Sequence, residues 1–394
     1  MALLTFSRVV TPALIFLGGY CLHGFSTTNG LFPAVESLKS KHQLPSSGSL
    51  ISKPSFPNSF TGFDPPDGLL ATLLLFFWPL LDGSNPAASL YGFLFAGQGV
   101  ALLSSIILEA SRKANKGRII AFTTIYGILF QCLGAGLAAP LYLTIYLFTS
   151  PLVTSSAALT PSALSIDEGL LTGHIFGVSL GYIAPTILMT LPQPDILPLD
   201  TKITAIVLWQ LFPVWQSIIA YVAKLIVGAK TPSASQADAQ TRQISLLRTV
   251  YKLSLAVSTT THIATWTLSL STLLLPSLFT AQTVQDFHPL NVFVPPNPFS
   301  DVKIGSIAQG SHWFLQYDYI ITGAAYVIWA SASRYAVGVK NAKADAGGFG
   351  VGAFLDIICR CVLLGPYSAA LTLLWDRDEA VFTGSNLEAG KKTA

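Results

Sequence analysis

The sequence is dominated by apolar stretches long enough to cross a lipid bilayer. Only 10% of its 394 residues are Asp, Glu, Lys or Arg, whereas 51% are hydrophobic. A membrane-crossing helix needs about 20 mostly apolar residues, because hydrocarbon offers no water to the backbone polar groups. Nine stretches approach or exceed this length: 8–25, 68–82, 88–109, 119–149, 169–191, 203–228, 250–276, 313–333 and 350–375.

These stretches predict an all-α protein, a polytopic bundle of about eight or nine transmembrane helices that forms one membrane-embedded domain over 1–394. Segments 27–67 and 281–311 are rich in proline and turn-forming residues and are predicted to be long irregular loops over the membrane mouth. A polar tail is predicted over 376–394. Its last four residues, KKTA, resemble a retrieval signal, so we expect an integral membrane protein of the endoplasmic reticulum.

Basic residues in the short connections bear on the topology. They concentrate in 110–118, 229–249 and 334–349, which are therefore predicted to lie on the cytosolic side. An odd number of predicted spans separates the first two of these connections, although an even number is required. Either 119–149 crosses twice or one span is re-entrant. A cytosolic tail creates the same conflict with 334–349, because one span separates them.

Composition and missing motifs exclude several classes of function. A net charge of +3 with scattered basic residues gives no nucleic-acid footprint. The four cysteines and six histidines are not spaced as a metal site or a disulfide framework, and no dinucleotide or phosphate-binding motif is present. There is also no DDxxD or NDxxD motif for magnesium-diphosphate binding. We expect no cofactor and no metal, the lipid bilayer as surroundings, and no obligatory protein partner.

The most prominent chemical cluster opens the eighth apolar stretch, with the sequence HWFLQYDY over 312–319. Helical periodicity places Asp318 on one face with Thr322, Tyr326 and Trp329. A carboxylic acid at the polar end with aromatic rings deeper in the helix would suit protonation followed by stabilisation of a cation. The alternative is an interfacial aromatic belt in which Asp318 pairs locally or caps a helix. His312 is a further catalytic candidate here, and Trp313 and Tyr317 are candidate substrate-binding residues.

Asp82 is the second candidate acid. It ends the FFWPLLDG run and begins a turn, and turn formation alone explains an aspartate there. However, the negative end of a helix dipole disfavours an ionised carboxylate, which would help a general acid. The predicted loops also place Asp82 and Asp318 toward the same side of the membrane.

Two other carboxylates have an arginine one helical turn away. Glu109 shares a helix face with Gln98, a candidate substrate-binding residue, and is followed by Arg112 at i+3. Asp356 has Arg360 at i+4. Both pairs are explained as structural ion pairs, although Arg360 could instead bind an anionic substrate group and free Asp356 for acid chemistry. The DRDE sequence at 376–379 faintly resembles an acid motif of soluble cyclases, but it is predicted to lie at a helix exit.

A resemblance to a known family adds to these observations. It is carried by motifs within two parts of the chain, 77–112 and 134–142: FWP, DG, SL, GQ and EASR in the first, and the stretch ending in PLY in the second. These motifs are similar to those of the integral-membrane terpene cyclases of fungal meroterpenoid biosynthesis, the type associated with ascofuranone and macrophorin.

The resemblance implies cyclisation of a farnesyl chain that is attached to an aromatic head. A carboxylic acid would protonate a terminal alkene or epoxide, the cation would close rings, and a base would remove the last proton. Asp318 or Asp82 is the expected acid, with Glu109 and Asp356 in reserve.

The alternative function is a transporter or channel, which should show paired broken helices or an inverted repeat. The sequence displays neither. A non-catalytic membrane scaffold is a third interpretation.

Overall fold

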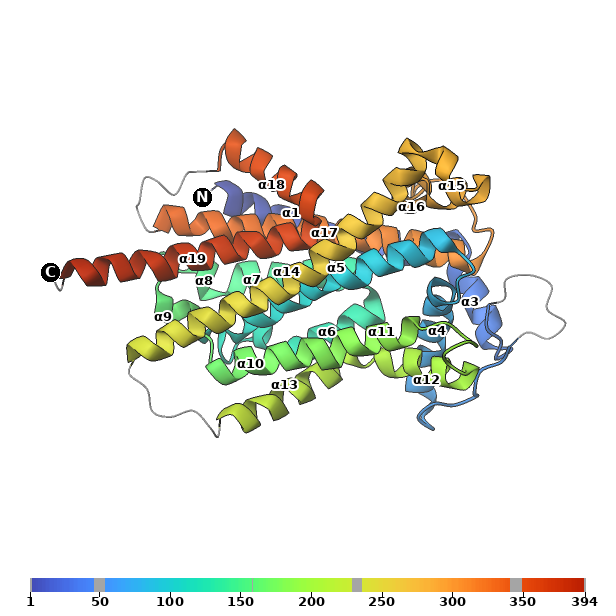
Figure 1. The fold of residues 1–394 in the computed structure, drawn as a ribbon, viewed down its shortest axis with the longest axis horizontal. Coiled ribbons are helices and arrows are strands. Elements are labelled where there is room, and N and C mark those ends of the chain that lie inside the picture. Colours follow the sequence, from blue (N-terminus) through green and yellow to red (C-terminus); the bar gives the residue numbers. More distant parts are fainter. Residues whose placement is uncertain (1, 46–53, 158, 229–235, 341–348, 393–394) are drawn as a thin grey trace.

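The computed structural model describes residues 2–45, 54–157, 159–228, 236–340 and 349–392. Within these ranges the secondary structure is helical, apart from one isolated bridge between Gln43 and Ser55. The helices lie mostly along one long axis and form a bundle (Figure 1). The predicted all-α class is confirmed.

The helices fall into a first half that ends near residue 190 and a second half that follows. Short π-helical turns join α1 to α2 and α10 to α11 without a break in the helix. The first half contains α1 (Ala2–Gly18), α2 (Phe25–Thr28), α3 (Leu31–Lys39), α4 (Asp64–Leu81), α5 (Pro86–Ser111), α6 (Thr123–Leu133), α7 (Ala135–Thr149), α8 (Pro151–Thr154), α9 (Pro161–Leu164), α10 (Glu168–Val178) and α11 (Ala184–Thr190). The second half contains α12 (Leu199–Trp209), α13 (Phe212–Gly228), α14 (Gln236–Leu274), α15 (Ala281–Phe287), α16 (Pro289–Phe293), α17 (Ile307–Lys340), α18 (Val351–Leu364) and α19 (Pro366–Lys392).

Fewer helices than predicted are apolar enough to be candidate membrane spans. Among the described residues, three qualify by length and composition: Ala2–Thr28, Pro86–Ser111 and Pro161–Thr190. A fourth candidate is the pair Leu199–Trp209 and Phe212–Ile226, bent by 72°. The long α14 and α17 do not qualify, since both carry many Ser, Thr and other polar side chains inside the bundle. The predicted count of eight or nine spans is therefore not confirmed, although membrane association is supported.

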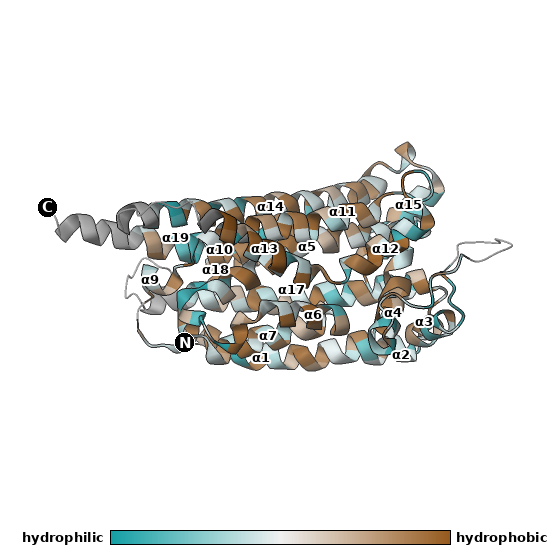
Figure 2. Cartoon of the chain, turned by 90° about the horizontal axis from the view of Figure 1, so that it is seen from below, coloured by the Kyte–Doolittle hydropathy of each residue, from teal (hydrophilic) through white to brown (hydrophobic). Residues whose placement is uncertain are grey.

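Helix α5 lies at the centre of the bundle. The Asn85 side chain caps it by accepting a hydrogen bond of 3.0 Å from the backbone N–H of Ala88, and Pro86 supplies a first residue that needs no hydrogen-bond acceptor. Its side chains are buried along most of its length, against α14, α17 and α19. Apolar residues dominate the middle of the bundle, and hydrophilic residues gather toward its two ends (Figure 2).

Two helices are broken inside the bundle, each at a glycine in a positive-φ conformation. Gly134 (φ 82°) separates α6 from α7, and Gly365 (φ 89°) separates α18 from α19. A side chain at this φ would be strained, which explains why glycine occupies both positions. Pro140, a residue type that often interrupts a helix, lies within α7, and the break in this stretch falls at Gly134 instead. The expectation that broken helices are absent is wrong.

Each break turns the chain back toward the end from which it came. The first break joins α6 and α7 into a hairpin. At the open end of this hairpin, Arg118 Nη1 donates to the carbonyl of Thr149, at 3.1 Å. The second break joins α18 and α19 in the same way, and Arg360 Nη1 of α18 donates to Asp376 of α19, at 2.8 Å. The stretches 119–149 and 350–375 therefore each form a helical hairpin, as the re-entrant alternative would require.

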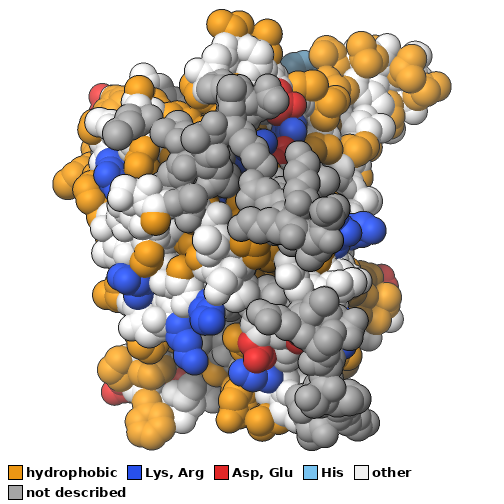
Figure 3. Space-filling view, turned by 90° about the vertical axis from the view of Figure 1, so that its left-hand side faces the viewer, with side chains coloured by type: hydrophobic (Ala, Val, Ile, Leu, Met, Phe, Trp, Pro, Cys, Tyr) orange, Lys and Arg blue, Asp and Glu red, His pale blue; other side chains and the backbone are white. Residues whose placement is uncertain are grey.

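One end of the bundle carries both chain termini together with α9, and α14 begins there (Figure 1). The connection at 113–115 contacts α9 at this end, and α17 ends there. The described parts of the three basic connections thus share one end, where Lys and Arg side chains are spread over the surface (Figure 3). Residues 341–348, 229–235 and the last two of the KKTA sequence lie outside the described residues.

The opposite end carries α3, α15 and α16, which belong to the two segments predicted to be irregular loops (Figure 1). That prediction is only partly right, because each segment contains short helices. The segment 376–394, which was predicted to be a polar tail, is mostly helical. Helix α19 continues from Pro366 through the DRDE sequence to Lys392, and Arg377 and Asp378 are buried.

Candidate active site

The carboxyl of Asp318 lies against the first break, at the N-terminus of α7. Helix α17 brings Asp318 there, and its Oδ1 accepts a hydrogen bond from the backbone N–H of Gly136. A Cβ added at Gly136 would meet that same oxygen at 3.0 Å, so a larger residue would crowd the carboxyl. Asp318 is 3% exposed, and no Lys or Arg among the described residues forms an ion pair with it.

Asp318 also lines a cavity of about 390 Å³ between the breaks and the helices that surround them. Rings form much of the wall, which otherwise consists of aliphatic side chains and a few polar groups. The size lies within the range of small-molecule sites. The aromatic and histidine members of the wall are His23, Phe32, Phe76, Phe77, Phe95, Phe130, Tyr182, Trp209, Phe212, Phe314 and Tyr367.

A second cavity of about 460 Å³ adjoins the first. The two share a set of wall residues: Phe77, Phe95, Tyr182, Trp209 and Leu315. Asp82 lines the second cavity, so the structure brings the two leading acid candidates to neighbouring cavities on one side of the bundle.

The surroundings of Asp82 differ from those of Asp318. Asp82 ends α4, and its Oδ1 accepts from the backbone N–H of Ser84 at 2.8 Å in an exposed turn. No Lys or Arg lies near Asp82 in the sequence, but the fold brings Lys202 of α12 close enough to interact with it electrostatically. Asp82 is therefore a half-exposed turn residue near a cation.

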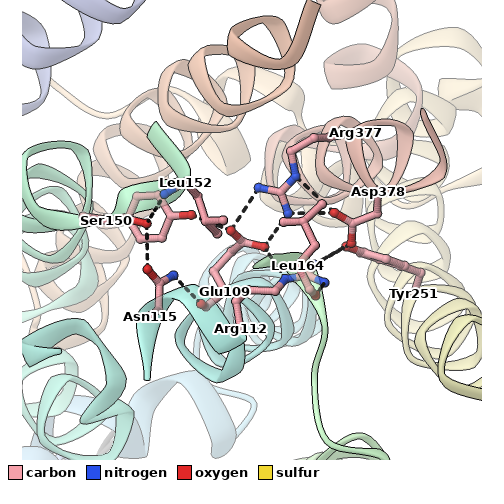
Figure 4. Close-up of polar contacts among 10 residues, drawn as sticks. Glu109, Arg112, Asn115, Ser150, Leu152, Leu164, Tyr251, Arg377 and Asp378 are labelled. Carbon is pink, nitrogen blue, oxygen red and sulfur yellow. Dashed lines mark hydrogen bonds and ion pairs between the residues drawn. The ribbon is translucent and has the colours of Figure 1, made fainter. Parts of the chain in front are cut away.

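Glu109 lies in a buried ion-pair network at the other end of α5 (Figure 4). Its carboxylate binds Arg112 at 3.0 Å and Arg377 at 2.6 Å, and it accepts from the hydroxyl of Tyr146 at 2.5 Å. Both arginines also pair with Asp378. These charges satisfy one another, and the network does not line either cavity. The expected structural pair is present, and it extends to the DRDE sequence, whose Arg377 and Asp378 hold α19 against α5.

Asp356 and Arg360 form the expected ion pair at 2.9 Å, and Arg360 also binds Asp376 at 2.8 Å. The side chain of Asp356 is 47% exposed. These residues tie α18 to α19 and lie away from both cavities. The structure therefore does not bring Arg360 to a position where it could bind an anionic group in either cavity.

Gln98 caps the second break much as Asp318 caps the first. Its Oε1 accepts from the backbone N–H groups of Tyr367 and Ser368, at 3.1 and 3.4 Å. Its Nε2 donates to the carbonyl of Leu364 and to two further oxygens, one of which is the Ser258 carbonyl at 2.8 Å. The amide is fully used in holding α19 and does not line either cavity.

The other predicted residues of α17 have structural partners. His312 Nε2 bonds to the carbonyl of Val292, at 3.0 Å, and Tyr317 donates to the carbonyl of Pro296, so both hold the 281–311 segment. Trp313 packs against Phe25. Tyr326 and Trp329 are buried and stack on each other at 5.4 Å, but neither of them lines the first or the second cavity.

Sequence reasoning missed most of the cavity wall. The rings come from α3, α4, α5, α6, α12, α13, α17 and α19 and from the two π-helical turns, so no single stretch contains the pattern. Trp209 and Lys202 are not among the candidate site residues that the sequence indicates. The one available signal for Lys202 was its position as a lone lysine at the start of an apolar stretch.

A buried acid beside an aromatic-walled cavity, in an all-helical and largely apolar chain, defines a site suited to carbocation chemistry. The CtvD domain family matches residues 7–382. Terpene cyclase ascI of Acremonium egyptiacum is 36% identical over 98% of this chain and 94% of its own length. Terpene cyclase janA of Penicillium janthinellum is 30% identical (93% and 94%), and terpene cyclase ctvD of Aspergillus terreus is 28% identical (93% and 97%). No solved structure matches the chain significantly.

The chain therefore belongs to the CtvD-domain family of fungal terpene cyclases. It is a terpene cyclase, and the sequence-based assignment of enzyme and family is confirmed. The broken helices, which a transporter would also show, here position an acid and a cavity.

Proposed function

We propose that this enzyme protonates and cyclises a farnesyl chain attached to an aromatic head, with Asp318 as the acid. The observation that carries the proposal is a buried carboxyl, without a cationic partner among the described residues, in the wall of an aromatic cavity. Burial away from cations disfavours the ionised form of a carboxyl, so a proton can be held there until the substrate binds.

The chemistry is an isomerisation. A proton passes from Asp318 to a terminal alkene carbon or an epoxide oxygen, the chain closes its rings through carbocations, and a base removes one proton from carbon. The Gly136 N–H fixes one carboxyl oxygen, which orients the acid toward the chain. Rings of the wall such as Phe76, Phe314 and Trp209 would stabilise the passing charge, at about 2 kcal/mol for a good desolvated contact.

Asp318 is favoured over Asp82 because of their surroundings. Asp82 is half-exposed and near the ammonium of Lys202, whereas Asp318 is buried and has no ion-pair partner among the described residues. Glu109 and Asp356 are held by arginines and serve the fold. The remaining site residues predicted on α17 act as packing and loop contacts in this proposal.

The proposed location is the endoplasmic reticulum membrane, with the chain inserted by its apolar helices. Many large apolar side chains on the outside of the bundle support lipid contact, for example Phe16, which is 79% exposed. The KKTA tail and the basic end of the bundle would then lie on the cytosolic side.

Microsomes carrying the chain test the proposal. They are given a farnesylated phenol or its terminal epoxide, and products are separated by retention and mass. A cyclised isomer of unchanged mass is expected. In D₂O, alkene protonation would leave carbon-bound deuterium in the product, whereas epoxide opening would leave deuterium only on exchangeable oxygen. Microsomes that cyclise neither substrate would contradict the proposal.

A further inference from the structure

The second cavity has a polar set that the proposed proton transfer does not use. Its wall contains the ammonium of Lys202, the hydroxyl of Ser89 and the carboxylate of Asp82, set among apolar side chains. A few polar groups in a mostly apolar cavity are the usual means of fixing the orientation of a ligand.

Lys202 is 1% exposed, and its ammonium is only partly satisfied. Nζ donates to the carbonyls of Leu81 and Leu191, at 2.7 and 3.0 Å, which are the residues that end α4 and follow α11. An ammonium has three N–H donors, so one is left for a further acceptor. Because burying a charge is costly, an oxygen placed there by a ligand would bind strongly.

Ser89 supplies an independent observation. Its Oγ is buried and has no hydrogen-bond partner among the described residues, yet the residue lines the cavity. Buried hydroxyls are nearly always paired, so an unpaired one on a cavity wall indicates a bound group.

The arrangement of the cavities indicates how a substrate would be oriented. The first cavity, with Asp318, is the more apolar in its wall residues. Asp82 lines both the second cavity and a third one of about 840 Å³, whose wall also contains Lys41, Asn85 and Lys303. A molecule with an apolar tail and an oxygenated head would therefore place its tail toward Asp318 and its head toward Lys202.

We propose that the second cavity is the subsite for the aromatic head, and that Lys202 and Ser89 bind an oxygen on it, such as a phenol or an adjacent carbonyl. This rests on the proposed function. The shared wall at Phe77 and Trp209 would contact the junction of head and tail. The subsite binds and positions the substrate, and no covalent step occurs in it.

Ser89→Ala gives the sharpest test, because the hydroxyl has no hydrogen-bond partner among the described residues and its loss should not affect folding. kcat/KM is measured for two substrates, a farnesylated phenol and the matching farnesylated benzene that lacks the oxygen. We expect a drop of about fivefold with the phenol, from one lost hydrogen bond, and no change with the benzene. Ser333→Ala, another buried unpaired hydroxyl that lines none of the three cavities, is the matched control and should change neither.

Lys202→Met is the second variant and should lower kcat/KM at least about tenfold with the phenol and much less with the benzene. Asp318→Asn should instead remove turnover of both substrates. Wild-type enzyme that cyclises both substrates, with equal losses or none in the Ser89 and Lys202 variants, would overturn the head subsite while leaving the proposed function standing. Wild-type enzyme that cyclises no substrate would overturn both.

Discussion

The two broken helices have nearly the same backbone geometry and different chemistry. Gly134 and Gly365 have φ values of 82° and 89°, and each precedes a helix whose first N–H groups are capped by a side chain from another helix. At the first break the cap is the carboxyl of Asp318, which lines a cavity. At the second it is the amide of Gln98, closed in by protein oxygens.

The difference shows how one structural device serves two purposes. Gln98 satisfies a helix end with a neutral group whose donors and acceptor all have partners. Asp318 satisfies the other helix end with a group that can also carry a proton into a cavity. The comparison therefore predicts that substitutions at the first break affect chemistry, and that substitutions at the second affect stability.

Asp318→Asn should have the largest effect. The asparagine Oδ1 can still accept from the Gly136 N–H, so folding should be nearly unchanged, but the amide cannot donate a proton as an acid. We expect cyclisation to fall by about 10²- to 10⁴-fold, the usual contribution of a general acid. Product formation per amount of folded protein measures this. A variant with more than a tenth of wild-type activity would remove Asp318 from the chemistry.

Glu109→Gln should cause the largest loss of stability. The substitution removes the negative charge that pairs with Arg112 and Arg377 inside the protein. Breaking a buried ion-pair network typically costs about 3–5 kcal/mol of folding free energy. Thermal unfolding in detergent should show a much lower midpoint. Molecules that remain folded should keep near-normal activity, and inactivity at full stability would instead make Glu109 part of the site.

Gln98→Ala should have an intermediate effect, again on stability. It leaves the N–H groups of Tyr367 and Ser368 without their acceptor, at a cost of about 1–3 kcal/mol. The midpoint of thermal unfolding should fall, while the activity of folded protein should change by less than about twofold. A loss comparable to that of Asp318→Asn would show that the two breaks are equivalent.

Asp82→Asn should have the smallest effect. The asparagine can still accept from the Ser84 N–H in the turn, and surface substitutions of this kind change stability by about 0.5 kcal/mol or less. We expect cyclisation rates within about threefold of wild type. A loss of a hundredfold would move the acid from Asp318 to Asp82.

The sequence predicted the helical class, the family and Asp318 as a leading acid, because these depend on local signals: long apolar stretches, short motifs and a carboxyl beside aromatics. It could not predict the cavity wall, which is assembled from many helices. Helical periodicity grouped Gln98 with Glu109 and Tyr326 with Asp318, but periodicity cannot tell a face that packs from a face that lines a cavity. Lys202 showed the same limit, since its proximity to Asp82 arises only from tertiary packing.

The breaks were hidden for a related reason. Pro140 seemed the obvious interruption of the long apolar stretch, yet a helix tolerates it within α7. The actual break at Gly134 depends on a positive φ, and on the carboxyl that α17 brings to the new helix end. A glycine in an apolar stretch does not by itself reveal either feature.

The central claim is that Asp318 supplies the proton that starts cyclisation. A single-turnover experiment with enzyme in excess over substrate tests this most directly, because it separates ring closure from product release. Asp318→Asn should bind the substrate with an affinity close to that of wild type, with a ring-closure rate constant at least about 100-fold lower. Equal rate constants for the two enzymes would contradict the account.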